Sequence, residues 1–124
     1  MVTLTNALAA AASGMEAQAM RLRHTSENIA NADTPGYQRK LTSFREVADG
    51  VEVGPVRLDR SPVARVYDPA HPLADGSGHH DGSNVDLVVE LADAREAQRS
   101  YEANLRLFDQ ARQMTQSLFD LIRR

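Results

Sequence analysis

The sequence predicts a mainly α-helical protein. Its long N- and C-terminal helices should pack as an antiparallel, coiled-coil-like pair, with a small β-hairpin or extended segment between them in the chain. Apolar residues recur with helical periodicity at both ends, whereas the middle carries short alternating patterns and turn residues. The 124 residues include three Phe, three Tyr and no Trp, which is little material for one compact core. We therefore expect residues 1–32 and 83–124 to form one helical domain and residues 33–82 to form the middle segment with a loop.

The first helix is predicted from apolar residues that lie seven positions apart. The main row is Leu8, Met15, Leu22 and Ile29, and a second row begins with Leu4 and Ala11 and continues with the polar Gln18 and Thr25. Thr3, Thr5 or Asn6 can cap the start of the helix, because their side chains accept hydrogen bonds from free backbone N–H groups. We expect the helix to end near Asn31, since Pro35 disfavours a helical conformation in the residue before it.

A tight turn is predicted after this helix, at residues 34–37. Pro35 suits the second position of a type II turn, and Gly36 suits the third position, which needs a positive φ. Asp33 can cap this turn with its side chain. An ordinary helix stop without a special role is the alternative interpretation.

The middle segment is predicted to contain one small hairpin. Residues 37–47 have the pattern of an extended segment, residues 51–58 that of an edge strand bent at Gly54-Pro55, and residues 63–67 that of a second strand. Residues 68–82 have the composition of a loop. A hairpin of this size is too small to be stable alone.

The last helix is predicted to begin at a capping box, in which Ser83 is followed three residues later by Asp86. One apolar row consists of Leu87, Leu91, Ala94, Tyr101, Leu105, Phe108, Phe119 and Ile122, and a second row of Leu107, Met114, Leu118 and Leu121. Together these rows are wider than one partner helix would cover, so we expect other subunits to cover the remainder. A simple two-helix hairpin is the alternative.

Fourteen apolar residues are our candidates for contacts between subunits. They are Leu4, Leu8, Ala11, Met15, Leu22 and Ile29 in the first helix, and Leu91, Tyr101, Leu105, Phe108, Met114, Leu118, Phe119 and Ile122 in the last.

Charge and composition exclude several classes of partner. The net charge of −3, with acids and bases interspersed, provides no basic stripe for nucleic acid or anionic lipid. The chain has no cysteine, which excludes disulfides and thiolate sites. The small apolar run at residues 7–14 is too short to span a membrane, and no Lys or Arg precedes it as in a secretory signal peptide. We expect neither membrane insertion nor a cleaved leader.

The best candidate for a metal site is a group of five potential ligands within eleven residues, namely His71, Asp75, His79, His80 and Asp81. The group lies in a predicted loop with no element to fix its geometry, so we expect a solvated loop. His24 in the first helix has no cysteine or serine motif near it. We therefore expect no metal, no cofactor and no catalytic residue, and hence no enzyme.

Three segments resemble the rod and hook family of flagellar axial proteins. Residues 26–37 resemble its N-terminal signature, residues 84–91 and 97–104 its C-terminal helix motif, and residues 66–75 a segment of the proximal-rod members. The motif positions are Asn28, Asn31, Ala32, Asp33, Thr34, Pro35, Gly36 and Tyr37 in the signature, and Asn84, Val85, Asp86, Tyr101, Glu102, Ala103 and Asn104 in the helix motif.

The resemblance implies a structural subunit of the flagellar rod, the drive shaft that carries torque from the basal-body ring to the hook. It implies partners among proximal and distal rod proteins, the ring-to-rod adaptor and the flagellar type III export apparatus, and self-assembly into a helical tube with the terminal helices inside. It also implies a place in the basal body, reached through export to the periplasm without a cleaved signal peptide. The alternatives are a sister subunit of the same rod and, in a different class, a soluble helical adaptor or export chaperone.

Overall fold

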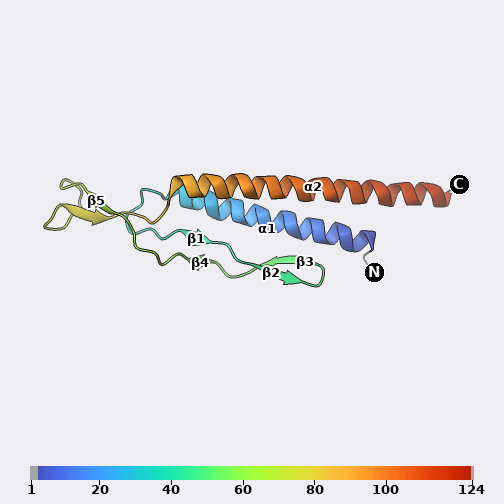
Figure 1. Cartoon of the computed structure of the whole chain (residues 1–124), viewed down its shortest axis with the longest axis horizontal. Helices are drawn as coiled ribbons and strands as arrows, with labels where there is room; N and C mark the ends of the chain where they lie inside the picture. The colour runs from blue at the N-terminus through green and yellow to red at the C-terminus, as the bar shows by residue number, and fades with distance from the viewer. Residues whose placement is uncertain (1–2, 124) are drawn as a thin grey trace.

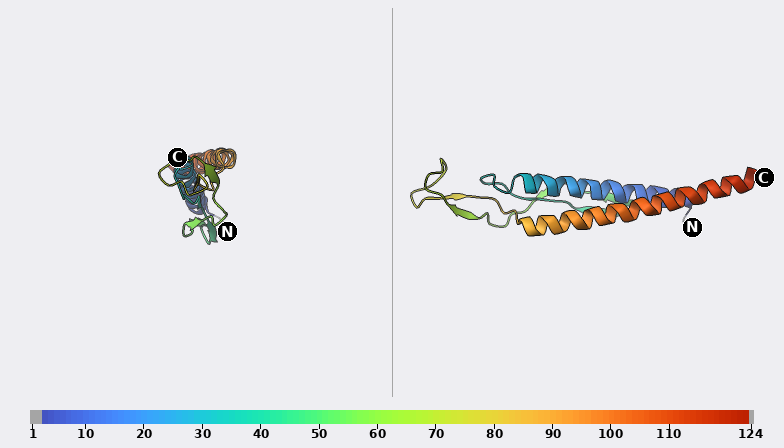
Figure 2. Two further views of the ribbon diagram at one scale, coloured as in Figure 1. Left: turned by 90° about the vertical axis from the view of Figure 1, so that its left-hand side faces the viewer. Right: turned by 90° about the horizontal axis from the view of Figure 1, so that it is seen from above.

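Two long antiparallel helices form the body of the molecule. The computed structural model describes residues 3–123, so the outermost positions of the two predicted helical ranges, residues 1–2 and 124, lie outside the described residues. Helix α1 (Leu4–Ala30) and helix α2 (Leu87–Arg123) lie side by side, with the start of α1 and the end of α2 towards the same end of the elongated molecule (Figures 1 and 2). Their 27 and 37 residues correspond to about 40 and 55 Å of helix. The predicted fold class is confirmed.

Helix α1 begins and ends where its capping residues predict. The Thr3 hydroxyl accepts a hydrogen bond of 3.1 Å from the Asn6 N–H, and Asn31 follows the last helical residue. In the turn that follows, the Tyr37 N–H donates to the Thr34 carbonyl over 3.1 Å and Gly36 has a φ of 73°. The side chain that accepts a bond at this turn is Asn31, from the Thr34 hydroxyl, and not Asp33 as predicted.

A bulky branched residue at position 36 should strain this turn. A Cβ added at Gly36 would meet no atom within 4 Å, so the cost of a substitution there is that of the backbone conformation alone. Gly36→Val should lower the free energy of unfolding by roughly 1–2 kcal/mol, and Gly36→Asn by much less, because Asn tolerates the left-handed region. Urea denaturation measures the difference. Gly76→Val is the matched control, since Gly76 also has open space around it but no positive φ. Equal stabilities of the valine and asparagine variants at position 36 would contradict the assignment.

Three separate two-stranded antiparallel ladders make up the middle segment. They pair β1 (Lys40–Leu41) with β4 (Arg57–Leu58), β2 (Phe44–Val47) with β3 (Gly50–Val53), and β5 (Arg65–Tyr67) with β6 (His79–Asp81). The predicted pairing of residues 51–58 with residues 63–67 is therefore wrong. The β2 and β3 strands are joined by only two residues, and this short turn pairs β3 with the strand before it.

The β2–β3 hairpin folds back along α1 (Figure 1). The Val51 N–H donates to the Ser13 hydroxyl over 3.1 Å, and a Cβ at Gly50 would lie 3.2 Å from the Ala10 Cα. Contact with the helix thus selects this hairpin, and that contact is not visible in the strand pattern of the sequence.

The prediction that residues 68–82 are only loop is also wrong, because His79–Asp81 form strand β6. The Asp75 carboxylate orders the intervening turn: it accepts bonds from the Ser77 hydroxyl (2.6 Å) and from the backbone N–H groups of Ser77 (2.9 Å) and His79 (3.2 Å). The Ser77 hydroxyl, these N–H groups and the Arg65 guanidinium hold the pKa of Asp75 well below its usual range. The loop is thereby shaped so that β6 can pair with β5.

Helix α2 begins later than predicted. The Asp86 carboxylate accepts a 3.0 Å bond from the Val88 N–H and is itself the cap. Ser83 does not take part in a capping box, because its hydroxyl donates to the Ala32 carbonyl at the end of α1 over 2.5 Å. Ser83 therefore ties the two helical ends together.

The contact between the helices is made of small residues. Ala11, Ala17, Ala97 and Ala111 are the buried apolar residues of the described chain, and a Cβ at Gly14 would lie 2.8 Å from the Asn104 side chain. Leu8 and Met15, in the main apolar row, are only half-buried, whereas Ala11 and Thr25, in the second row, are buried. Neither described helix has a stretch that is both long and apolar enough to cross a membrane.

Candidate functional site: a buried polar junction and an apolar helical face

A buried ion pair joins the middle segment to the start of α2. Glu90 is fully buried, and one of its carboxylate oxygens accepts a 2.6 Å hydrogen bond from Arg39 Nε. The same guanidinium reaches Asp59 at 3.5 Å and Asp93 at 3.4 Å. A buried carboxylate is stable only when it is paired and hydrogen-bonded, and Arg39 supplies both conditions. Burial alone would lower the pKa of Arg39, but the contacts with Glu90 and Asp59 together outweigh burial and raise the pKa, so Arg39 keeps its charge.

Asn28 connects this pair to α1. Its amide nitrogen donates to the second Glu90 oxygen over 3.2 Å and to the Lys40 carbonyl over 3.0 Å. Its amide oxygen accepts bonds from the Tyr37 hydroxyl (2.8 Å) and the Lys40 N–H (2.7 Å). Asn28 is 1% exposed and uses both ends of its amide, so it bridges three segments that are distant in sequence. Burial raises the pKa of the Tyr37 hydroxyl, which keeps its proton available for this bond.

Asn84 makes the corresponding connection just before α2. Its amide oxygen accepts a 2.7 Å bond from the Arg39 N–H, and its amide nitrogen donates to the carbonyls of Asp59 (2.9 Å) and Ser61 (3.1 Å). We call the assembly of Asn28, Tyr37, Arg39, Asp59, Asn84, Glu90 and Asp93 the junction cluster. Three of the predicted motif positions, Asn28, Tyr37 and Asn84, belong to it.

His24 lies one turn before the junction cluster and is buried. One ring nitrogen lies 2.7 Å from the Thr42 hydroxyl on the strand segment. Burial lowers the pKa of His24, so the folded protein favours the neutral ring. The contribution of this histidine to stability is complete above the ordinary pKa of about 6.5 and is lost as the pH falls below it, because the unfolded chain then binds the proton first. This contact joins α1 to the segment between β1 and β2.

The histidines of the middle segment pack with one another. The rings of His71 and His80 stack with their centroids 3.9 Å apart, and His79 lies against Tyr67. Asp75 and Asp81 are instead bound to Arg65 at 2.6 and 2.7 Å. Within residues 3–123 no group of three or more such side chains is placed to hold a metal ion.

A second feature is the apolar face of α2 that the chain itself leaves uncovered. Of the predicted interface residues, six on α2 are exposed: Leu91, Leu105, Met114, Leu118, Phe119 and Ile122. Tyr101, Phe108 and the predicted leucines, methionine and isoleucine of α1 are half-buried, and Ala11 is buried within the chain's own helix contact. A groove of about 320 Å³ between the start of α1 and α2 adjoins this face, lined by Leu4, Ala7, Leu107, Ala111 and Met114 among others.

The remaining motif positions lie in the turn after α1, just before α2, and within α2. Asp33, Thr34, Pro35 and Gly36 are exposed in the turn after α1, while Asn31 and Ala32 are half-buried beside it. Val85 and Asp86 precede α2, Asn104 packs over Gly14, and Glu102 and Ala103 are exposed.

Sequence reasoning missed the other half of the junction cluster, namely Arg39, Asp59, Glu90 and Asp93. One signal was available: Glu90 is a single acid among Val88, Val89 and Leu91, a place where a buried and paired charge is to be expected.

Comparison with known proteins places the two helices in related families. Residues 4–38 match the family described as flagella basal body rod protein, and residues 77–121 match the C-terminal family of flagellar basal body rod FlgEFG proteins. Over 99% of its length the chain is 43% identical to the flagellar basal-body rod protein FlgC of Agrobacterium fabrum, covering 98% of that protein. It is 33% identical to FlgC of Salmonella typhimurium over 91% of its length, and 30% identical to FlgC of Borreliella burgdorferi over 96%.

Proposed function

This chain belongs to the flagellar basal-body rod protein family, and we propose that it acts as a structural subunit of the proximal rod. The observation that carries the proposal is the similarity to FlgC proteins along nearly the whole of both chains, with family matches on both helices. As a rod subunit it transmits torque from the basal-body ring towards the hook, and it acts as a structural protein rather than an enzyme.

The uncovered apolar residues support a role in assembly. Exposure of an apolar helix face to water is unfavourable in free energy, and contact with neighbouring subunits removes that face from water. We assign the exposed residues Leu91, Leu105, Met114, Leu118, Phe119 and Ile122 to such contacts. The half-buried leucines and methionine of α1 extend the same surface. The neighbours are other proximal and distal rod proteins and the ring-to-rod adaptor of the basal body, in a helical tube with the two helices on its inner side.

The route to the basal body follows from the same assignment. The chain is exported by the flagellar type III apparatus without a cleaved signal peptide and assembles in the periplasm. An export substrate of this kind passes through the apparatus unfolded, so the junction cluster forms only after export.

Deletion of the gene in its own flagellated host tests the proposal. Basal bodies isolated from the deletion strain should lack the rod beyond the ring, the cells should not swim, and the intact gene should restore both. A tagged copy should be found in the rod of isolated basal bodies by mass spectrometry. Normal flagella and swimming in the deletion strain would overturn the proposal.

A further inference from the structure

The helix contact alone does not define how far α2 lies along α1. Its buried apolar residues are four alanines, and the largest fully buried side chains of the described chain are Glu90 and Asn28. Large interlocking side chains fix the register of most helix pairs, because each knob fits one hole. Alanine provides no such knob, and larger side chains of the contact such as Leu8, Met15 and Phe108 are only half-buried, so the apolar contact resists sliding weakly.

The spacing of the small residues makes one alternative register especially accessible. Ala97, Asn104 and Ala111 lie seven residues apart on the face of α2 that meets α1. A shift of α2 by seven residues, about 10 Å along its axis, places one of these residues where another was. Asn104 then takes the place of Ala97, and Ala111 takes that of Asn104 over Gly14. Leu118 takes the place of Ala111, where the groove between the helices offers room, so the helices can still pack in this register.

The contacts of Glu90 do not tolerate the same shift. Its two carboxylate oxygens are held from different segments, one by Arg39 Nε at 2.6 Å and the other by the Asn28 amide at 3.2 Å. A seven-residue shift brings Ala97 to this place, and a methyl group can neither neutralise Arg39 nor accept from Asn28. The same shift breaks the bonds of Ser83 to Ala32 and of Asn84 to the Arg39 N–H, but these bonds are between neutral groups, whereas those of Glu90 involve charge. Buried polar groups without partners are costly, and charged ones most of all, so the contacts of Glu90 favour one register over the others.

We propose that the ion pair between Arg39 and Glu90, with Asn28, sets the axial register of α2 against α1 and thereby fixes how far the apolar end of α2 projects. Arg39 and Glu90 are positioning residues in this role. The register is a property of the chain itself, and its use in a rod rests on the proposed function.

Distance measurement between two labels on the full chain tests the proposal. The sequence has no cysteine, so Ser26→Cys and Gln113→Cys introduce the only thiols for spin labels, at exposed positions far apart along the helix axes. A register shift then changes the label distance by nearly its full length of about 10 Å. The otherwise unmodified protein should give one narrow distance in double electron–electron resonance. A distribution that is already broad would overturn the proposal.

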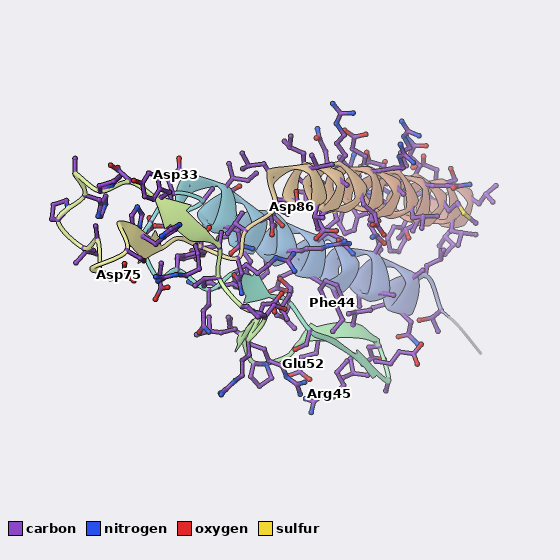
Figure 3. All side chains as sticks on the ribbon, turned by 60° about the vertical axis from the view of Figure 1, so that its left-hand side comes forward. Asp33, Phe44, Arg45, Glu52, Asp75 and Asp86 are labelled. Carbon is purple, nitrogen blue, oxygen red and sulfur yellow. The ribbon has the colours of Figure 1, made fainter. Side chains whose placement is uncertain are left out.

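Removal of the ion pair should broaden the distribution without unfolding the helices. In Arg39→Met/Glu90→Leu both charges are replaced by apolar groups of similar length, and Asn28 keeps its bonds to Lys40. We expect unchanged helix content by circular dichroism and a second distance displaced by about 10 Å. Arg45→Met/Glu52→Leu removes an exposed ion pair from the β2–β3 hairpin, away from the helices (Figure 3), and should leave the single distance unchanged.

Glu90→Gln is the second variant, because it keeps the shape of the side chain and an acceptor for Asn28 while losing the charge. In Glu90→Gln the displaced label distance should be found in a smaller fraction of the molecules than in Arg39→Met/Glu90→Leu. A folded variant of either kind that retains the single original distance overturns the proposal. Loss of helix content in both variants also overturns it, since the pair would then maintain the fold rather than choose among registers.

Discussion

Replacement of Arg39 by Ala should lower the free energy of unfolding by about 3–5 kcal/mol, because it leaves the fully buried Glu90 carboxylate without its cation. Asp59 and Asp93 lie around the same guanidinium, so its removal also leaves three acidic groups close together. Urea denaturation of the full chain measures the loss, which is a large fraction of the stability of a small domain. The Arg39→Ala variant should therefore unfold at a much lower urea concentration than the unmodified protein.

Two controls distinguish the effect of an unpaired buried carboxylate from the effect of removing any arginine. Arg45→Ala removes an arginine whose side chain is 70% exposed and should change the stability by less than about 1 kcal/mol. Arg39→Met/Glu90→Leu should cost less than Arg39→Ala alone, since no carboxylate is then left buried. An Arg39→Ala variant as stable as Arg45→Ala would contradict the importance of the junction cluster.

Replacement of Leu118 by Asp should abolish rod assembly while leaving the subunit stable. Leu118 is 51% exposed near the end of α2, so a carboxylate there stays in water in the monomer. At a subunit contact the same carboxylate would be buried, which costs several kcal/mol. The mutant protein should be exported, the cells should be non-motile, and isolated basal bodies should lack an extended rod.

Gln113→Asp provides the comparison on the same helix, at an exposed polar position outside the apolar rows. Cells that carry the Gln113→Asp variant should swim normally. Leu105→Asp should behave as Leu118→Asp does, whereas Phe108 is half-buried against the chain itself and is less informative. Normal swimming of the Leu118→Asp strain would exclude this face from the subunit contacts.

The helices could be predicted from the sequence because their signal is long and local. The periodic rows, the Thr3 cap and the Pro35-Gly36 turn each act within a few residues of the helix that they define. The strand pairings could not, because each strand has two to four residues and its partner is chosen by contacts outside it. Ser13 of α1 accepts from the β2–β3 hairpin, and Asp75 shapes the loop that brings β6 to β5.

The junction cluster shows the same limit for the site. Asn28 and Glu90 are 62 residues apart in sequence, and Arg39 and Glu90 are 51 apart. The resemblance pointed to Asn28, Tyr37 and Asn84 as motif positions, but only the folded chain shows that they bond to a common set of charges. No pattern in the sequence links the charged members, because Arg39 and Asp59 lie in the middle segment whereas Glu90 and Asp93 lie on α2.

The unequal lengths of the two helices give the molecule ends that differ in kind. One end is a single helix with apolar side chains, and the other is a set of loops with the β5–β6 ladder (Figure 1). A body with unlike ends has a direction, and copies that are joined head to tail all point the same way. Such a stack offers one kind of surface for addition at its growing tip and another kind at its base. Growth from one end only would then follow from the shape of the subunit.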